Sequence, residues 1–173
     1  MVPADAADPA NVRRLIFCSG QIYYQLAKAR KQNNLSNVAI VRVEQISPFP
    51  YDLAAEQVAR YPNAEIIWAQ EEPLNAGAWT YVSPRLRSML KQWSLRQADQ
   101  CEVMYAGRQP AASTATGASC GPYWQAGLGT QTVALTQHAR VASQSWGPAR
   151  PAGFKKLHIE EEKRLIKQAL FGN

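Results

Sequence analysis

The sequence lacks several features that mark common functional classes. None of its apolar runs is long enough for a membrane-spanning helix, so we expect no membrane partner. Its first residues, MVPADAADPANV, have neither the basic nor the apolar region of a signal or transit peptide. The formal charge is +6, but the basic residues are spread out rather than gathered in a stripe with aromatics. We therefore expect no nucleic-acid partner.

Cysteine is scarce, and familiar catalytic motifs are missing. The three cysteines, Cys18, Cys101 and Cys120, form no CxxC pair or Cys/His cluster. This argues against structural zinc and favours a reducing compartment. The chain also has no Gly-rich phosphate loop and no Ser/His/Asp pattern. The Ser19-Gly20 pair after an apolar run is either a tight turn or a weak anion site at a helix start.

What is present is an alternation of short apolar runs with helical patterns. The runs at residues 15–18, 38–43, 65–69 and 102–105 show no polar alternation, which is typical of parallel strands covered on both faces. The order βαβαβαβ predicts the α/β class, with a three-layer, mostly parallel sheet flanked by helices. We expect a linker at residues 1–11 and one domain at 12–173.

Three polar residues are expected to cap the helices that follow these strands. They are Ser19, Asp52 and Ser83, the last followed by Pro84 in the first helical position. In the third helix an amphipathic stripe is predicted to face the core. The stripe consists of Leu86, Met89, Leu90 and Trp93.

The candidate site lies in the stretch AEIIWAQEEPLNAGAW, residues 64–79, where a strand runs into Glu71 and Glu72. Ligands and partners usually meet parallel sheets at the carboxyl ends of the strands. The two carboxylates could act as a general acid–base pair, but loop capping or interface hydrogen bonding suits adjacent residues on an extended chain better. Asn75 and Trp79 are included as interface candidates, and Trp79 and Tyr81 are expected to expose apolar surface.

Two arginines at strand ends are further candidates for an effector or interface site. Arg42 lies near the end of the second predicted strand, and Arg108 follows the fourth. Each could recognise a phosphate or carboxylate. Each could equally form a plain surface ion pair.

The last third of the chain has a different composition. Residues 118–153 contain no Asp, Glu, Lys, Ile, Phe or Met, and show no sustained period. Such a segment is unusually long for a connection inside a domain, so we describe it as an irregular, atypical insertion. A helix is expected after Phe154. Glu160, Glu161 and Glu162 would lie in its first turns, and Ile159, Leu165, Ile166, Ala169 and Leu170 would form a docking stripe.

Four motifs carry a resemblance to a known family. The stretches LIFCSGQIYYQL, VAIVRVEQISPFPYDL, RYPNAEIIWAQEEPLNAGAWTYVSPRL and YAGRQPAASTATG occur in order, and the resemblance resumes at Phe154. The chain resembles the C-terminal domain of the thiamine-diphosphate-dependent, decarboxylating subunit of 2-oxoglutarate dehydrogenase. A related enzyme that acts on 2-oxoadipate shares the outline. The family's domain resembles that of transketolases and helps to form a homodimer.

The resemblance implies a parent enzyme of the tricarboxylic acid cycle in the mitochondrial matrix. With thiamine diphosphate and Mg²⁺, the parent would decarboxylate 2-oxoglutarate and pass the succinyl group to a lipoyl arm of the dihydrolipoyl succinyltransferase complex. This chain has no Gly-Asp-Gly signature and none of the family's active-site histidines. We therefore assign it no catalytic, cofactor-binding or metal-binding residue, and expect the missing N-terminal and thiamine-diphosphate-binding domains to be its partners.

Two interpretations remain for the role of the fragment and for residues 118–153. The fragment is either a structural, dimerising or regulatory part of the enzyme, or a non-catalytic module that binds acyl-CoA or docks on the complex. Some relatives bear an acetyl-CoA regulatory site, and of its arginines only Arg108 has a counterpart here. Joining Gly117 to Phe154 restores the family pattern, so residues 118–153 are either a translated intron or a lineage-specific surface insertion.

Overall fold

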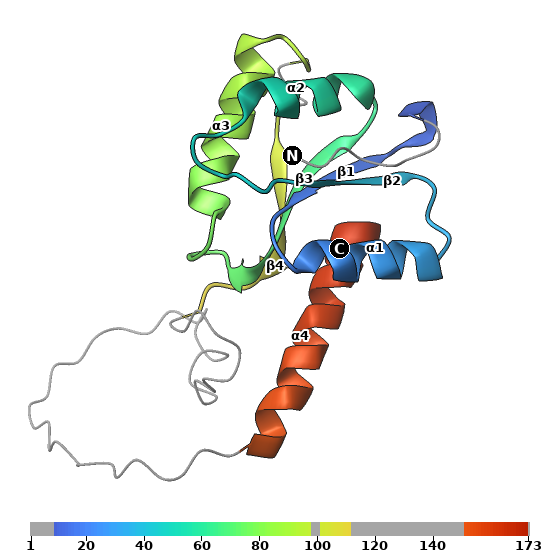
Figure 1. Cartoon of the computed structure of the whole chain (residues 1–173), viewed down its shortest axis with the longest axis vertical. Helices are drawn as coiled ribbons and strands as arrows, with labels where there is room; N and C mark the ends of the chain where they lie inside the picture. Colours follow the sequence, from blue (N-terminus) through green and yellow to red (C-terminus); the bar gives the residue numbers. More distant parts are fainter. Residues whose placement is uncertain (1–8, 98–100, 112–150, 173) are drawn as a thin grey trace, which may run out of the picture.

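The computed structural model describes residues 9–97, 101–111 and 151–172. Figure 1 shows the arrangement of its helices and strands. In chain order these are η1 (Pro9–Asn11), β1 (Arg14–Cys18), α1 (Ile22–Gln32), β2 (Val38–Arg42), α2 (Tyr51–Arg60), β3 (Glu65–Pro73), α3 (Trp79–Gln92), β4 (Val103–Arg108) and α4 (Pro151–Phe171).

The four strands form one parallel sheet in the order β2-β1-β3-β4. β1 pairs with β2 on one side, where Ile16 lies opposite Ile40. On its other side it pairs with β3, where Ile16 lies opposite Ile67. The first connection leads from β1 to β2, and the second leads from β2 back past β1 to β3, so the sheet has a switch point between β1 and β3. This confirms the predicted α/β class with a parallel sheet flanked by helices.

The side chains of each strand alternate between two core clusters, one on each face of the sheet. Leu15 and Phe17 of β1 belong to the cluster beneath α2 and α3. Ile16 and Cys18 belong to the cluster beneath α1 and α4. Both faces are buried, which explains why the strand sequences show no polar alternation. Figure 1 shows the two helix pairs on either side of the sheet.

The expected helix starts are wrong at all three positions. α1 begins at Ile22 after Gln21, and α2 begins at Tyr51 after Pro50, and neither of these N-terminal cap residues forms a side-chain capping hydrogen bond. Neither Ser19 nor Asp52 therefore serves as the cap residue. The strands and their turns fix where each helix begins, and this tertiary constraint overrides the local preference for a Ser or Asp cap.

α3 begins four residues before the expected cap, and Pro84 lies inside it. Its first N–H, on Trp79, donates to the side-chain Oε1 of Gln70 at 2.9 Å. A distant residue thus supplies the cap expected from Ser83. Pro84 has no N–H to donate to the carbonyl of Thr80. Because Thr80 is exposed, water can donate a hydrogen bond to that carbonyl instead. At the other end, Trp93 follows the last helical residue and is 43% exposed, not part of the buried stripe.

α4 also begins earlier than expected, at Pro151, so Glu160, Glu161 and Glu162 lie in its middle rather than its first turns. The docking stripe is confirmed at Leu165, Ala169 and Leu170, which are buried, and Ile166 packs beside them. Ile159 is 38% exposed and does not dock. The predicted linker 1–11 is described only from Pro9. Of the predicted insertion 118–153, residues 118–150 lie outside the described residues.

Side chains from the flanking helices bind the exposed edges of the sheet. On β2, Arg30 of α1 donates to the carbonyl of Val38 at 3.3 Å. On β4, Arg87 of α3 donates to the carbonyl of Val103 at 3.4 Å. Gln168 of α4 donates to the Tyr105 carbonyl at 3.2 Å and accepts from the Gly107 N–H at 3.3 Å. Edge strands otherwise present unpaired backbone groups that attract other strands.

We predict that the domain folds without residues 118–153. Ala111 and Glu161 line one pocket, so the end of β4 lies beside the middle of α4. Residues 112–117 can span about 20 Å, and Phe154 is about 10 Å along the helix from Glu161. A chain that joins Gly117 to Phe154 should unfold cooperatively and be about 1–2 kcal/mol more stable, because a shorter loop loses less entropy. Urea unfolding measures this.

The matched control joins Ala111 directly to Phe154, which removes the span that residues 112–117 provide. This variant should be clearly less stable than the first. If instead the Gly117–Phe154 chain loses cooperative unfolding, the deleted residues are needed for the fold. Sequencing of the mature transcript separates an intron from a genuine insertion, because an intron is absent from most reads.

Candidate functional site

The carboxyl ends of the strands bring four of the six predicted site positions together. Glu71 and Glu72 lie near the end of β3, which continues to Pro73 rather than stopping at residue 69 as predicted. Arg108 ends the neighbouring strand β4. Asn75 joins these two strand ends, because its side chain donates to the Ala111 carbonyl at 2.9 Å and accepts from the Ala111 N–H at 3.1 Å.

Arg42 lies apart from this group, at the end of β2 and on the far side of β1. Its guanidinium lies over the rings of Tyr23 and Tyr24, 5.0 and 5.4 Å from their centroids. It donates to the Tyr24 hydroxyl at 2.7 Å and forms an ion pair with Glu44. The hydrogen bond to Tyr24 is the largest of the effects that raise the pKa of Arg42. Arg42 is therefore held in a local aromatic and acidic cluster, separate from the β3–β4 end.

The centre of the site is Gln70, a residue that the sequence analysis did not single out. Gln70 is 4% exposed. Its Oε1 accepts from the Trp68 indole N–H and from the Trp79 N–H, both at 2.9 Å. Its Nε2 donates to the carbonyls of Ala76 at 2.7 Å and Pro73 at 3.2 Å. One buried amide therefore joins β3, the loop after it and the start of α3.

Two glycines permit the close packing around this amide. Gly77 has φ +66°, and a Cβ there would lie 2.9 Å from the Nε2 of Gln70. A Cβ on Gly107 would overlap the Tyr105 hydroxyl and approach the Gln70 carbonyl to 2.9 Å. A larger residue at either position would displace the groups that fix the strand ends.

Trp79 and Tyr81 expose only a part of their surface. Both are partly buried and pack against the core cluster beneath α2 and α3. The Trp79 ring lies 5.1 Å from that of Tyr105, with an interplanar angle of 60°. Arg85 lies 3.4 Å from the centroid of Tyr81 and covers its ring. Because α3 begins at Trp79, both aromatics lie in the first turn of the helix, where they pack against the core.

Burial changes the acidity of two groups at the strand ends. It raises the pKa of Tyr105 to about 12. The Tyr105 Oη lies 2.9 and 3.0 Å from the carbonyl oxygens of Glu72 and Arg108, so its proton is shared between β3 and β4. The pKa of Glu71 is raised by burial and by the charge of Glu72, although His158 acts in the opposite direction.

A third group, the thiol of Cys18, lies at the end of β1. The side chain is fully buried, and burial is the main reason that its pKa is raised to about 12. Cys101, which precedes β4 rather than lying within it, is likewise free and buried. Cys120 and His138 lie outside the described residues. Within the described ranges, no group of three His, Cys, Asp or Glu residues is placed to hold a metal ion, and no helix could span a membrane.

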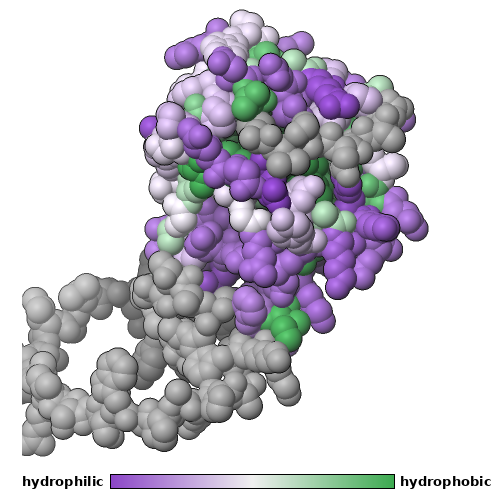
Figure 2. All heavy atoms as spheres, in the orientation of Figure 1, coloured by the Kyte–Doolittle hydropathy of each residue, from purple (hydrophilic) through white to green (hydrophobic). Residues whose placement is uncertain are grey.

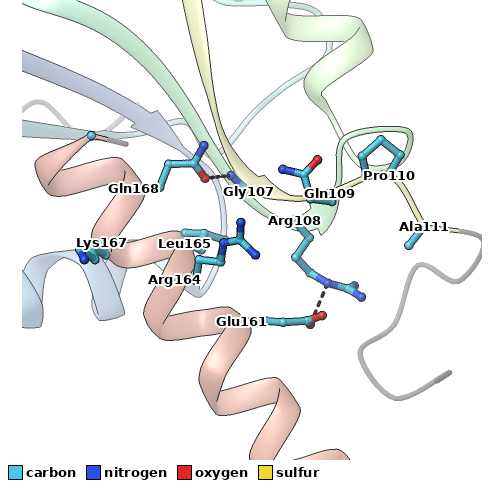
Figure 3. Close-up of a pocket in the computed structure, with 11 residues that line it drawn as sticks. Gly107, Arg108, Gln109, Pro110, Ala111, Glu161, Arg164, Leu165, Lys167 and Gln168 are labelled. Carbon is cyan, nitrogen blue, oxygen red and sulfur yellow. Dashed lines mark hydrogen bonds and ion pairs between the residues drawn. The ribbon is translucent and has the colours of Figure 1, made fainter. Parts of the chain in front are cut away.

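A pocket of about 700 Å³ opens between the end of β4 and α4. Figure 3 shows Arg108 reaching from β4 to α4, where its Nε lies 2.9 Å from a carboxylate oxygen of Glu161. Arg164 points from α4 toward β4, and Lys167 also lines the pocket. Among the described residues of the lining, three cations and one carboxylate give a net positive charge. Of these charged residues the sequence predicted a site role for Arg108 alone, because the α4 residues reach the pocket only through the tertiary fold.

The Gln70 amide should be the most sensitive polar group of the site. In a Gln70→Met variant the Trp68 indole N–H and the backbone groups that bind the amide lose their partner in a buried place. We expect a loss of about 2–4 kcal/mol of unfolding free energy. Gln45→Met, at an exposed position, should change stability by less than about 0.5 kcal/mol. Urea unfolding of both variants checks this, and equal stabilities would contradict the central role of Gln70.

Comparison with known proteins relates the chain to one family. Residues 2–125 match the family model described as 2-oxoglutarate dehydrogenase C-terminal. The chain is 50% identical over 115 residues to the mitochondrial 2-oxoglutarate dehydrogenase of Caenorhabditis briggsae, covering 66% of this chain and 11% of that protein. The chain is also 50% identical over 110 residues to the Schizosaccharomyces pombe protein of the same name, and this match covers 63% of this chain and 10% of that protein.

A 2-oxoglutarate dehydrogenase-like, mitochondrial protein of Pongo abelii is 46% identical over 121 residues, which cover 68% of this chain and 11% of that protein. The chain thus spans about a tenth of the length of the curated relatives it matches. The family match ends at residue 125, so the resemblance noted from Phe154 onward stays a prediction. Since the match covers most of the chain, the protein belongs to the 2-oxoglutarate dehydrogenase C-terminal family.

Proposed function

We propose that the chain is a structural part of a thiamine-diphosphate-dependent 2-oxoglutarate dehydrogenase and that it does not itself carry the catalytic groups. The observation that supports this most is the family match at 2–125, together with much longer relatives that bear this enzyme's name and of which the match covers only 10–11%. The relatives' names also support a mitochondrial location. The partners would be the rest of the same subunit, a second subunit and the succinyltransferase complex.

The residues that the structure describes do not fit the cofactor of the proposed parent enzyme. Thiamine diphosphate with Mg²⁺ supplies the carbanion chemistry that decarboxylation of a 2-oxo acid requires. A diphosphate–metal site needs clustered oxygen ligands, and the described residues offer no such group. We therefore assign no step of the reaction to this chain.

What the chain can contribute is a rigid surface at the carboxyl ends of its strands. The Gln70 amide and the Tyr105 hydroxyl fix the ends of β3 and β4 from within. Glu71, Glu72 and Asn75 are exposed on this fixed frame. Exposed polar groups on an ordered backbone form specific hydrogen bonds with little loss of entropy. This suits contact with the remainder of the subunit better than acid–base catalysis.

This role predicts the outcome of an activity assay. The isolated chain should form no NADH from 2-oxoglutarate in the presence of thiamine diphosphate, Mg²⁺, coenzyme A and the other two enzymes of the complex. Activity should return when the chain replaces the matching region of the S. pombe enzyme. The same enzyme without that region is the control and should be inactive.

Turnover by the isolated chain would contradict the supporting role, as would full activity of the truncated control. The chimaera also tests the closest alternative. Higher kcat/KM for 2-oxoadipate than for 2-oxoglutarate, relative to the unmodified S. pombe enzyme, would assign the domain to a 2-oxoadipate dehydrogenase.

A second candidate function, binding of an acyl-CoA effector, is favoured by the pocket between β4 and α4. In the part of the lining that the structure describes, Arg108, Arg164 and Lys167 lie with one carboxylate, that of Glu161. A phosphate-bearing ligand is attracted by such a set of cations. Figure 2 shows a largely hydrophilic surface over α1 and α4, as expected where a charged ligand rather than an apolar partner binds.

Titration with acetyl-CoA tests this second candidate. Arg164→Gln removes one cation without breaking the Arg108–Glu161 pair, and should weaken binding roughly tenfold to a hundredfold, the worth of one charge-assisted hydrogen bond. Arg60→Gln, on α2 at the opposite face of the sheet, is the matched control and should bind like the unmodified chain. Absence of binding, or an equal loss in both variants, would refute the effector site.

A further inference from the structure

The outward side of α1 carries cations and no acid. At its N-cap and along the helix, four exposed residues recur at helical spacing: Gln21, Tyr24, Lys28 and Lys31. Residues spaced in this way lie along one side of a helix, and we call these four the α1 stripe. The 11 residues of α1 include no Asp or Glu. The charge of the two lysines is therefore not balanced by the helix itself.

The neighbouring helix extends this positive surface. α4 lies beside α1 on the same face of the sheet, and both helices bury side chains in one core cluster. The acids of α4 all precede Lys163, and both Lys163 and Lys167 are exposed. Figure 3 shows Lys167 on the side of α4 that is next to α1. Together the two helices present a group of lysines to solvent, and such a group attracts negatively charged partners.

One aromatic residue of the α1 stripe is exposed and yet held in place. Tyr24 is 61% exposed. Its hydroxyl accepts a hydrogen bond from Arg42 at 2.7 Å, and the guanidinium lies 5.4 Å from its ring centroid. The ring of Tyr23 meets that of Tyr24 edge-on, with the centroids 5.4 Å apart. A tyrosine fixed in this way loses little conformational entropy on binding, and tyrosines often dominate the energy of protein interfaces.

We propose that the α1 stripe is a docking surface for an acidic segment of a partner protein. Tyr24 is the anchor, against which an apolar side chain of the partner packs, and Lys28 and Lys31 bind carboxylates beside it. Charge complementarity identifies the occupant, because a lysine-rich surface favours Asp and Glu and repels basic partners. The inference does not rest on the proposed function, because it uses only the surface of α1 and its neighbour.

The same surface suits nucleic acid and membrane less well. Phosphate groups are held most specifically by the planar guanidinium of arginine. The two arginines nearest the stripe, Arg30 and Arg42, already donate to groups of this chain. A helix that lies on a membrane buries its apolar side in lipid, whereas α1 buries Ile22 and Leu26 in the core. An acidic protein segment needs neither a guanidinium nor an apolar helix face.

Titration of the 173-residue chain with a fluorescent peptide of about 12 residues, rich in Glu with interspersed Leu, tests the proposal. Tyr24→Ala should weaken binding about fivefold to thirtyfold, and Lys28→Gln about twofold to fivefold at low salt. Tyr51→Ala and Lys91→Gln are the matched controls, because these exposed residues lie on α2 and α3 at the opposite face of the sheet. Both controls should bind like the unmodified chain, and added salt should weaken binding throughout.

Amide chemical shifts locate the bound peptide. Changes centred on residues 21–31 would support the proposal, whereas changes centred on the pocket between β4 and α4 would overturn it. Equal binding of a Lys-rich peptide with the same Leu pattern, or an equal loss in the control variants, would also overturn it. Tighter binding of a DNA duplex, or of vesicles of phosphatidylcholine and phosphatidylserine, through the same residues would refute a protein partner. None of these measurements involves enzyme activity, so a failure here is distinguishable from a failure of the proposed function.

Discussion

The arrangement of the strand ends depends on one buried amide. Gln70 continues a strand whose preceding residues are apolar, and its side chain has to find both donors and acceptors in the interior. It does so by capping α3 and by binding the loop that joins β3 to that helix. A satisfied buried amide is strongly directional, so it fixes one geometry where apolar packing would allow several. The positions of Trp79, Gly77 and the exposed carboxylates all follow from it.

A second constraint operates at the edge of the sheet, where α4 takes the place of a neighbouring strand. The side-chain amide of Gln168 imitates a backbone unit and binds β4 as another strand would. Arg14 of β1 donates to the carbonyls of Gln168 and Ala169 at 3.3 and 3.2 Å, which satisfies the last turn of the helix. The helix is therefore tied to the sheet by polar contacts at one end and by the Arg108–Glu161 pair near its middle.

The sequence was sufficient for the layers of the fold but not for its polar connections. Uninterrupted apolar runs identified the four strands, because burial of both faces leaves a direct mark on composition. Helix starts failed, because a cap from Gln70 comes from another element and leaves no local pattern near Trp79. Gln70 itself could have been noticed as an amide within an apolar run. The partners of Arg108 could not, since Glu161 and Arg164 are brought to it only by the packing of α4 on β4.

The burial of Cys18 at the end of β1 determines when its thiol can react. Because burial raises the pKa of Cys18 to about 12, its sulfur is a neutral thiol in almost every folded molecule at neutral pH, whereas the thiolate is the form that reacts. Oxidants and electrophiles thus reach this sulfur chiefly when the sheet opens. Oxidation or alkylation of Cys18 would therefore accumulate in proportion to how often the protein unfolds, and molecules that stay folded would keep an unmodified thiol.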